Sequence, residues 1–218
     1  MTTTFNQQKA YIREMLTKRD FNALEQWATT LSSPLRRLVS LTYDSDELIA
    51  WRAIEGVGRV AALMAAKNLE KVRDTIRRLL WHMSDESGGV GWHSPEIIGE
   101  ILVNVPALIP EYGPLLPAYF REEPFERGAF MAVFRAASVD ADPFREFAAD
   151  VEAGLAEADP IIRAFSLGTL NILNDGQPNI KKMEPDKTKI RFYNFSNGLF
   201  TETTIGAFVR EYLDDTKY

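Results

Sequence analysis

One short segment of the sequence gathers most of the residues that could do chemistry. Residues 81–96 contain both histidines of the chain, three carboxylates, two tryptophans and three glycines. The candidate binding residues in this segment are His82, Asp85, Glu86, Gly88, Gly89, Gly91, Trp92, His93 and Glu96. Imidazole and carboxylate groups could converge on a divalent metal. Together with backbone N–H groups and the N-terminus of a helix beginning at Ser94, they could instead bind a small anionic ligand.

The same segment also has a purely structural interpretation, which we favour. In it the glycines form a tight turn, and His82 and His93 lie on helix surfaces. The spacing of these side chains matches no metal-binding signature, so neither a metal nor a cofactor is expected. A ligand or partner site in the 84–93 loop is the alternative hypothesis.

Part of this segment repeats a pattern found 41 residues earlier, since residues 51–60 and 92–101 share four positions. The matched pairs are Trp51 and Trp92, Glu55 and Glu96, Gly58 and Gly99, and Val60 and Ile101. A period of this length is typical of two-helix repeats, which bury their apolar faces by stacking on one another. We expect the tryptophans to pack in the core between layers, with an exposed aromatic ladder as the alternative. The two glutamates would project together from successive layers; paired acids are the alternative, but nothing beyond their proximity favours general-acid catalysis.

Two looser copies follow, over 129–136 and 166–173, with Phe134 and Asn171 at the glycine position. Counted from Ala53, the anchor positions are separated by 41, 35 and 37 residues, which predicts loops of unequal length. Small residues are required where helices of successive layers cross closely. The conserved spacing of small residues across the four copies therefore predicts helix–helix contacts.

The pattern of small residues, aliphatic residues and glycine over roughly 44–173 resembles HEAT repeats, the helical-hairpin family that includes the phycobilisome lyase subgroup. The resemblance implies an all-α fold, a HEAT-like α-α superhelix or solenoid, whose curved surface binds another macromolecule. Because the later copies lack the glycine, curvature and layer spacing are expected to differ there.

The remaining segments complete the predicted domain organisation. Amphipathic helices at 5–17, 21–31 and 34–42 predict an N-terminal helical cap over 1–43, and residues 174–188 are a polar linker. Two strand patterns flank Asn197-Gly198, a pair typical of a tight hairpin turn, and a helix over 205–213 follows. An isolated hairpin is marginal in water. Residues 189–218 are therefore predicted to dock on the final repeat around Phe165, Leu170 and Leu173.

Composition limits the possible functions. The chain has 218 residues, a formal net charge of -6 and no cysteine, which excludes cysteine catalysis and disulfides. An acidic protein repels nucleic acid on average. No signal-like start and no uncharged apolar run of membrane-spanning length is present. We expect a cytoplasmic protein that binds neither nucleic acid nor a membrane.

No serine-hydrolase, phosphate-loop, dinucleotide-binding or zinc-protease motif occurs in the sequence. No catalytic residue is therefore predicted, and an enzyme is not expected. The predicted function is a non-catalytic interaction module, or scaffold, that binds a protein partner through the solenoid surface and the 84–93 loop. A bilin- or cofactor-lyase activity is the alternative that the resemblance implies, and a HEAT-like nucleic-acid-binding protein is a further one.

Overall fold

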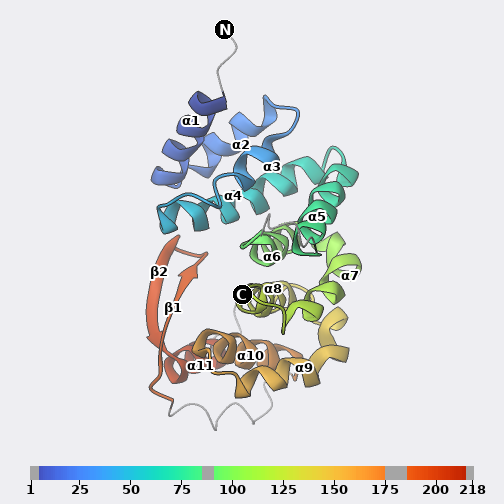
Figure 1. The fold of residues 1–218 in the computed structure, drawn as a ribbon, viewed down its shortest axis with the longest axis vertical. Helices are drawn as coiled ribbons and strands as arrows, with labels where there is room; N and C mark the ends of the chain where they lie inside the picture. The colour runs from blue at the N-terminus through green and yellow to red at the C-terminus, as the bar shows by residue number, and fades with distance from the viewer. Residues whose placement is uncertain (1–4, 85–90, 175–185, 215–218) are drawn as a thin grey trace.

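The computed structural model describes residues 5–84, 91–174 and 186–214. Over these residues the protein is mostly helical, with one small two-stranded antiparallel sheet (Figure 1). The first three helices are α1 (Phe5–Lys18), α2 (Phe21–Thr29) and α3 (Pro34–Val39). They cover one end of the molecule and pack on helix α4. No helix in these ranges is long and apolar enough to cross a membrane.

Four helices stack in sequence order through the middle of the molecule, and we call them the inner helices (Figure 1). They are α4 (Glu47–Ala65), α6 (Ser94–Asn104), α8 (Glu126–Ala137) and α10 (Pro160–Leu173). Asp46 and Asp159 cap the first and last of them by accepting hydrogen bonds from backbone N–H groups of the first turn. Most of their residues are buried, because each inner helix has neighbours on several sides.

Outer segments connect the inner helices along one side of the stack (Figure 1). The first is the regular helix α5 (Leu69–Ser84). The second consists of η1 (Pro106–Leu108), α7 (Ile109–Tyr112) and η2 (Gly113–Tyr119), and the third of η3 (Asp142–Phe147), α9 (Ala148–Ala153) and η4 (Gly154–Ala156). Prolines at positions 106, 110, 114 and 117 divide the second segment, because proline lacks the N–H that a continuous helix needs.

The inner helices approach one another closely at glycine. A Cβ atom added at Gly58 would lie 2.7 Å from the carbonyl oxygen of Glu100, and one at Gly99 would lie 2.6 Å from the Cα atom of Ala132. At the contact between α8 and α10 the glycine lies on the later helix, not the earlier one. A Cβ atom at Gly168 of α10 would lie 2.6 Å from the ring of Phe134 of α8. Where the third copy of the pattern has phenylalanine, the facing helix therefore supplies the glycine.

The C-terminal residues form a hairpin and a helix on the opposite side of the stack from α5 (Figure 1). Strand β1 (Lys189–Asn194) pairs antiparallel with β2 (Leu199–Thr204), and α11 (Ile205–Asp214) follows directly. Helix α11 packs on α10, where the ring centroids of Phe208 and Phe165 lie 6.2 Å apart. The strands extend beyond this contact and run along the stack as far as α4, which the sequence pattern did not predict.

We expect Gly58→Leu and Gly99→Leu each to lower the free energy of unfolding by about 2–4 kcal/mol, because a long side chain cannot fit at these helix crossings. Urea unfolding followed by circular dichroism measures the effect. Arg78→Leu, at an exposed position of α5, is the matched control and should have little effect. Wild-type midpoints for both glycine variants would contradict the proposed packing.

Candidate functional site

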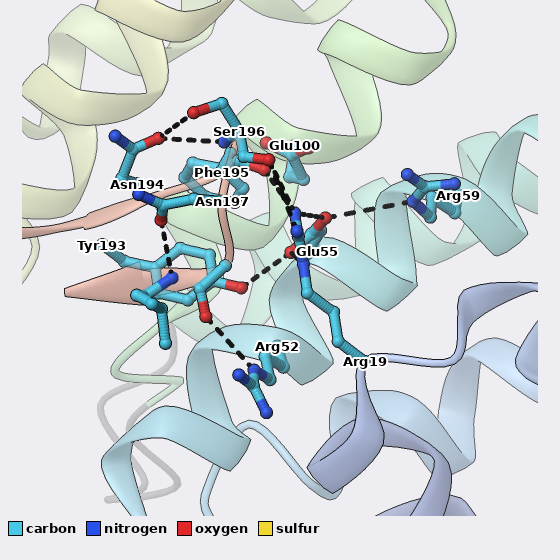
Figure 2. A network of polar contacts seen from close by, with 12 residues as sticks. Arg19, Arg52, Glu55, Arg59, Glu100, Tyr193, Asn194, Phe195, Ser196 and Asn197 are labelled. Carbon is cyan, nitrogen blue, oxygen red and sulfur yellow. Dashed lines mark hydrogen bonds and ion pairs between the residues drawn. The ribbon is translucent and has the colours of Figure 1, made fainter.

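The richest polar cluster of the described residues lies where the hairpin meets α4 (Figure 2). Its centre is the carboxylate of Glu55, whose side chain is 5% exposed. The hydroxyl of Tyr193 donates to its Oε2 atom at 2.7 Å, and Nη2 of Arg19 donates to its Oε1 atom at 2.8 Å. Arg59 adds a longer ion pair at 4.0 Å. One buried carboxylate thus joins residues from the start, the middle and the end of the chain.

Two arginines hold the main chain of the hairpin tip, which we define as residues 193–198. Arg19 donates to the carbonyl oxygen of Phe195 at 2.6 Å, and Nε of Arg52 donates to that of Gly198 at 3.2 Å. Within the tip, Asn194 accepts hydrogen bonds from both the backbone N–H and the hydroxyl of Ser196 (Figure 2). The turn therefore has internal order as well as external donors.

Aromatic rings surround Trp51 beside this polar cluster. The indole of Trp51 stacks on the ring of Tyr193, with centroids 5.6 Å apart and planes inclined by 18°. Three more rings contact Trp51 edge-on, with ring centroids no more than 6.5 Å from that of the indole: Phe195, Phe200 and His93. Trp51 therefore packs against the hairpin and His93, which differs from the packing between layers that its repeat position suggested.

The exposure of Trp92 contradicts the expectation that both tryptophans pack in the core. Its side chain is 61% exposed, so the prediction of core packing is wrong for this residue. Trp92 comes just before α6 begins at Ser94, and it points away from the helix stack rather than into it. The repeat equivalence of the two tryptophans holds in sequence, but the hairpin covers only Trp51.

Two further carboxylates on α6 are buried near Glu55. Glu100 accepts hydrogen bonds from Arg135 at 2.8 Å and from Asn104 at 3.1 Å, and burial raises its pKa above the ordinary value despite the Arg135 charge. The guanidinium of Arg135 also lies 4.3 Å from the centroid of the Phe195 ring, so α8 contacts the hairpin tip too.

Glu96 has a different environment. Its Oε1 atom lies 3.4 Å from Nδ1 of His93, while its Oε2 atom packs against Gly128 in the first turn of α8. The N-terminal end of a helix favours a nearby negative charge, which offsets part of the cost of burying this carboxylate. Glu55 and Glu96 thus lie on successive inner helices, as the repeat predicted, but each has its own partner: an arginine for Glu55 and a histidine for Glu96.

Burial changes the protonation equilibria of two groups in this region. Burial, followed by the hydrogen bond to Glu55, raises the pKa of the Tyr193 hydroxyl well above its ordinary value, so this group is a permanent hydrogen-bond donor. Burial by itself lowers the pKa of His93, but the hydrogen bond and the charge of Glu96 outweigh that effect and the pKa rises. Tyr193 and His93 are thus each held by a buried carboxylate, Glu55 and Glu96 respectively.

The residues predicted from the 81–96 segment divide into separate groups. His82 lies in the last turn of α5, and its ring centroid is 5.2 Å from that of Trp81. Gly91 is buried against Ser94 and His82. His93 and Glu96 face the inner helices, and Trp92 is exposed. Asp85, Glu86, Gly88 and Gly89 lie outside the described residues. Within the described ranges, no group of three metal-ligating side chains forms.

The sequence analysis missed the residues that organise the cluster, namely Arg19, Arg52 and Tyr193. Arg19 has a φ angle of 52°, which is uncommon for a residue with a side chain. No local sequence pattern predicts this conformation. Arg52 lies on α4, where it is only 9% exposed. A charged residue at a core position of a predicted inner helix is the signal that could have identified it.

Comparison with known proteins adds one distant relative. An uncharacterised protein of Archaeoglobus fulgidus is 27% identical over 172 residues, which cover 76% of this chain and 89% of the relative. No family model matches the chain. No solved structure matches it either.

We expect Tyr193→Phe to lower the free energy of unfolding by about 1–2 kcal/mol, because buried Glu55 loses a hydrogen-bond donor. Combined with Glu55→Gln in a double-mutant cycle, it should show a coupling energy of about 1–2 kcal/mol. Tyr11→Phe, at a residue that is 52% exposed, is the control and should be neutral. Additive effects of the two substitutions would contradict a direct interaction in solution.

The raised pKa of His93 predicts a pH dependence of stability. Protonated His93 stabilises the fold below the unfolded-state pKa of about 6.5, and this contribution is lost as pH rises through the higher folded-state pKa. Thermal melts at about pH 6 and pH 8 should therefore show a larger loss of stability for wild type than for His93→Gln. The two proteins differ only at position 93, so the difference reports on His93 alone. Equal losses would show that the pairing with Glu96 does not contribute.

Proposed function

We propose that this protein is a non-catalytic protein-binding module of the HEAT-like α-solenoid type, and that it recognises a protein partner at the junction of α5 and α6. The observation that carries the proposal is the exposure of two tryptophans at this junction. Trp81 is 60% exposed and Trp92 is 61% exposed. Trp81 precedes the 84–93 loop that was predicted to bind a partner, and Trp92 lies within it.

The serial packing of the inner helices supports the HEAT-like part of the proposal. Each inner helix contacts the next, and outer segments connect them along one side. Glycine or alanine at the crossings keeps the spacing small, as in stacked helical repeats. Folds of this kind host many functions, so the binding role is argued from the surface and not from the fold.

The backbone next to the two tryptophans is packed on both sides of the junction. The backbone at Gly91 packs against the side chain of Ser94, and a Cβ atom at Gly91 would lie 3.4 Å from Cβ of His82. The residues next to Trp81 and Trp92 are thus in contact. Tryptophan is enriched at the energetic centre of protein interfaces, because one rigid side chain buries a large area. Two such side chains on anchored backbone fit a recognition surface.

The polar cluster favours binding over catalysis. Glu55 and Glu100 each pair with an arginine, and the hydroxyl of Tyr193 is committed to Glu55. A general acid or base needs a proton that it can exchange with a substrate. In this cluster the carboxylates hold the hairpin in place. The lyase and nucleic-acid-binding alternatives rest on the HEAT resemblance alone.

We expect Trp81→Ala/Trp92→Ala to weaken partner binding by at least ten-fold without changing the unfolding midpoint, because both side chains are exposed. A photoreactive amino acid at position 92 would first capture the partner in the native cell, and titration with the purified partner would then give affinities. Tyr11→Ala/Leu115→Ala, at residues 52% and 44% exposed, is the matched control. Full affinity of the tryptophan variant would exclude this surface.

A further inference from the structure

Arg52 is a buried cation whose hydrogen bonds all go to neutral groups. Its side chain donates to the carbonyl oxygens of Thr17 at 2.7 Å, Leu16 at 3.2 Å and Gly198 at 3.2 Å. Within the described residues no carboxylate lies in ion-pair distance of it. Burying a charge without a counter-ion is costly, so this position carries a penalty that packing alone does not require. Two of these bonds are to the last turn of α1, where helix carbonyl groups carry partial negative charge, and the third joins that helix end to the turn of the hairpin.

Arg19 directly follows α1 and has the positive φ angle of a helix C-terminal cap, with its N–H bonded to the carbonyl oxygen of Leu16. Its positive φ angle directs the side chain toward the hairpin tip, where it donates to the carbonyl oxygens of Phe195 and Ser196. Gly198, with φ of 70°, packs directly against the Arg19 side chain, so a Cβ atom there would overlap it. The arginines therefore fit a turn that has glycine at this position.

Together these residues form a site of the kind that binds peptides (Figure 2). Two guanidinium groups donate to main-chain carbonyls, Trp51 offers a flat face to the ring of Tyr193, and Glu55 accepts from the Tyr193 hydroxyl. Main-chain contacts supply affinity in peptide recognition, and side-chain contacts supply specificity. The bound segment lies 146 residues away from Arg52 in the sequence.

The two faces of β1 dock on different parts of the molecule. Directly before the tip, Phe192 packs against Phe165 and Phe208, which anchor β1 to α10 and α11. Tyr193 uses the opposite side of the strand to reach Trp51. The remaining link of β1 to α4 is the ion pair of Arg191 and Glu47, with side chains 45% and 57% exposed, and exposed pairs contribute little.

We propose that the surface formed by Arg19, at the end of α1, and by Trp51, Arg52 and Glu55 of α4 is a recognition site for a tight-turn peptide with an aromatic residue ahead of the turn. In this structure the protein's own hairpin tip fills the site. A partner segment of the same chemistry binds by displacing the tip, so the hairpin is a built-in competitor. This site is separate from the Trp81 and Trp92 surface, and it does not depend on the function proposed there.

The test uses a fluorescein-labelled synthetic peptide with the sequence of residues 189–204 as the probe. Full-length protein carrying Tyr193→Ala and Phe195→Ala has a weakened tip and an open site, so it should bind the peptide at least ten-fold more tightly than wild type. The reason is that the wild-type tip competes at the high effective concentration of a tethered ligand. A peptide with alanine at the same Tyr and Phe positions is the control for specificity and should bind poorly.

A second variant assigns the binding to the proposed face. Adding Arg52→Gln to the open protein should reduce peptide affinity at least ten-fold, whereas adding Arg78→Gln on the outer face of α5 should not. Equal binding of the peptide by wild type and by the open variant would overturn the proposal. So would absence of binding by an open variant that retains its helical content.

Hydrogen exchange on the wild-type chain keeps the proposal testable if the open variant does not fold. Excess unlabelled peptide should speed amide exchange in residues 193–200 of the intact protein and leave α11 unchanged. Unchanged exchange at the hairpin tip under peptide concentrations in the millimolar range would overturn the proposal. Faster exchange in α11 as well would show general unfolding and would also overturn it.

Discussion

The close approach of consecutive inner helices is the constraint on which the rest of the structure depends. At Gly58 and Gly99 the facing backbone leaves no room for a side chain, and at Gly168 the ring of Phe134 takes that space. This spacing aligns α4, α6 and α8 so that their buried polar residues fall on one side of the stack. Glu55 and Glu100 then lie near enough for a single hairpin tip to contact the groups that pair with both.

The hairpin tip makes the polar side of the stack compatible with burial. Without it, Arg52 and Glu55 would face solvent, and Trp51 would lose its stacking partner. With it, nearly every charged group there gains a hydrogen bond, which is what a low-dielectric environment requires. Removing one partner from such a network is more costly than never having formed it, because the remaining charge stays buried. The two ends of the chain are therefore energetically linked through α4.

The sequence predicted the helical stack more completely than it predicted the site. Small residues at a regular spacing identify helix crossings, and the copies around Gly58 and Gly99 mark α4 and α6 correctly. The exposure of Trp92 was not predictable, because a repeat pattern says nothing about which of two equivalent residues a distant segment covers. The reach of β1 to α4 was missed for the same reason. Alternation of apolar residues predicts a strand, but the partner of Tyr193 lies 138 residues earlier and leaves no local signal.

The contact between Arg19 and Phe195 has a consequence for how the molecule folds. These residues are 176 positions apart, so this contact cannot form before almost the whole chain has been synthesised. The helical stack, in contrast, is built from neighbouring segments and can assemble from the N-terminus onward. Before the hairpin arrives, Arg52 can already bond to Leu16 and Thr17, and Glu55 can pair with Arg19. The hairpin therefore completes the burial of charges whose first partners come from the N-terminal helices.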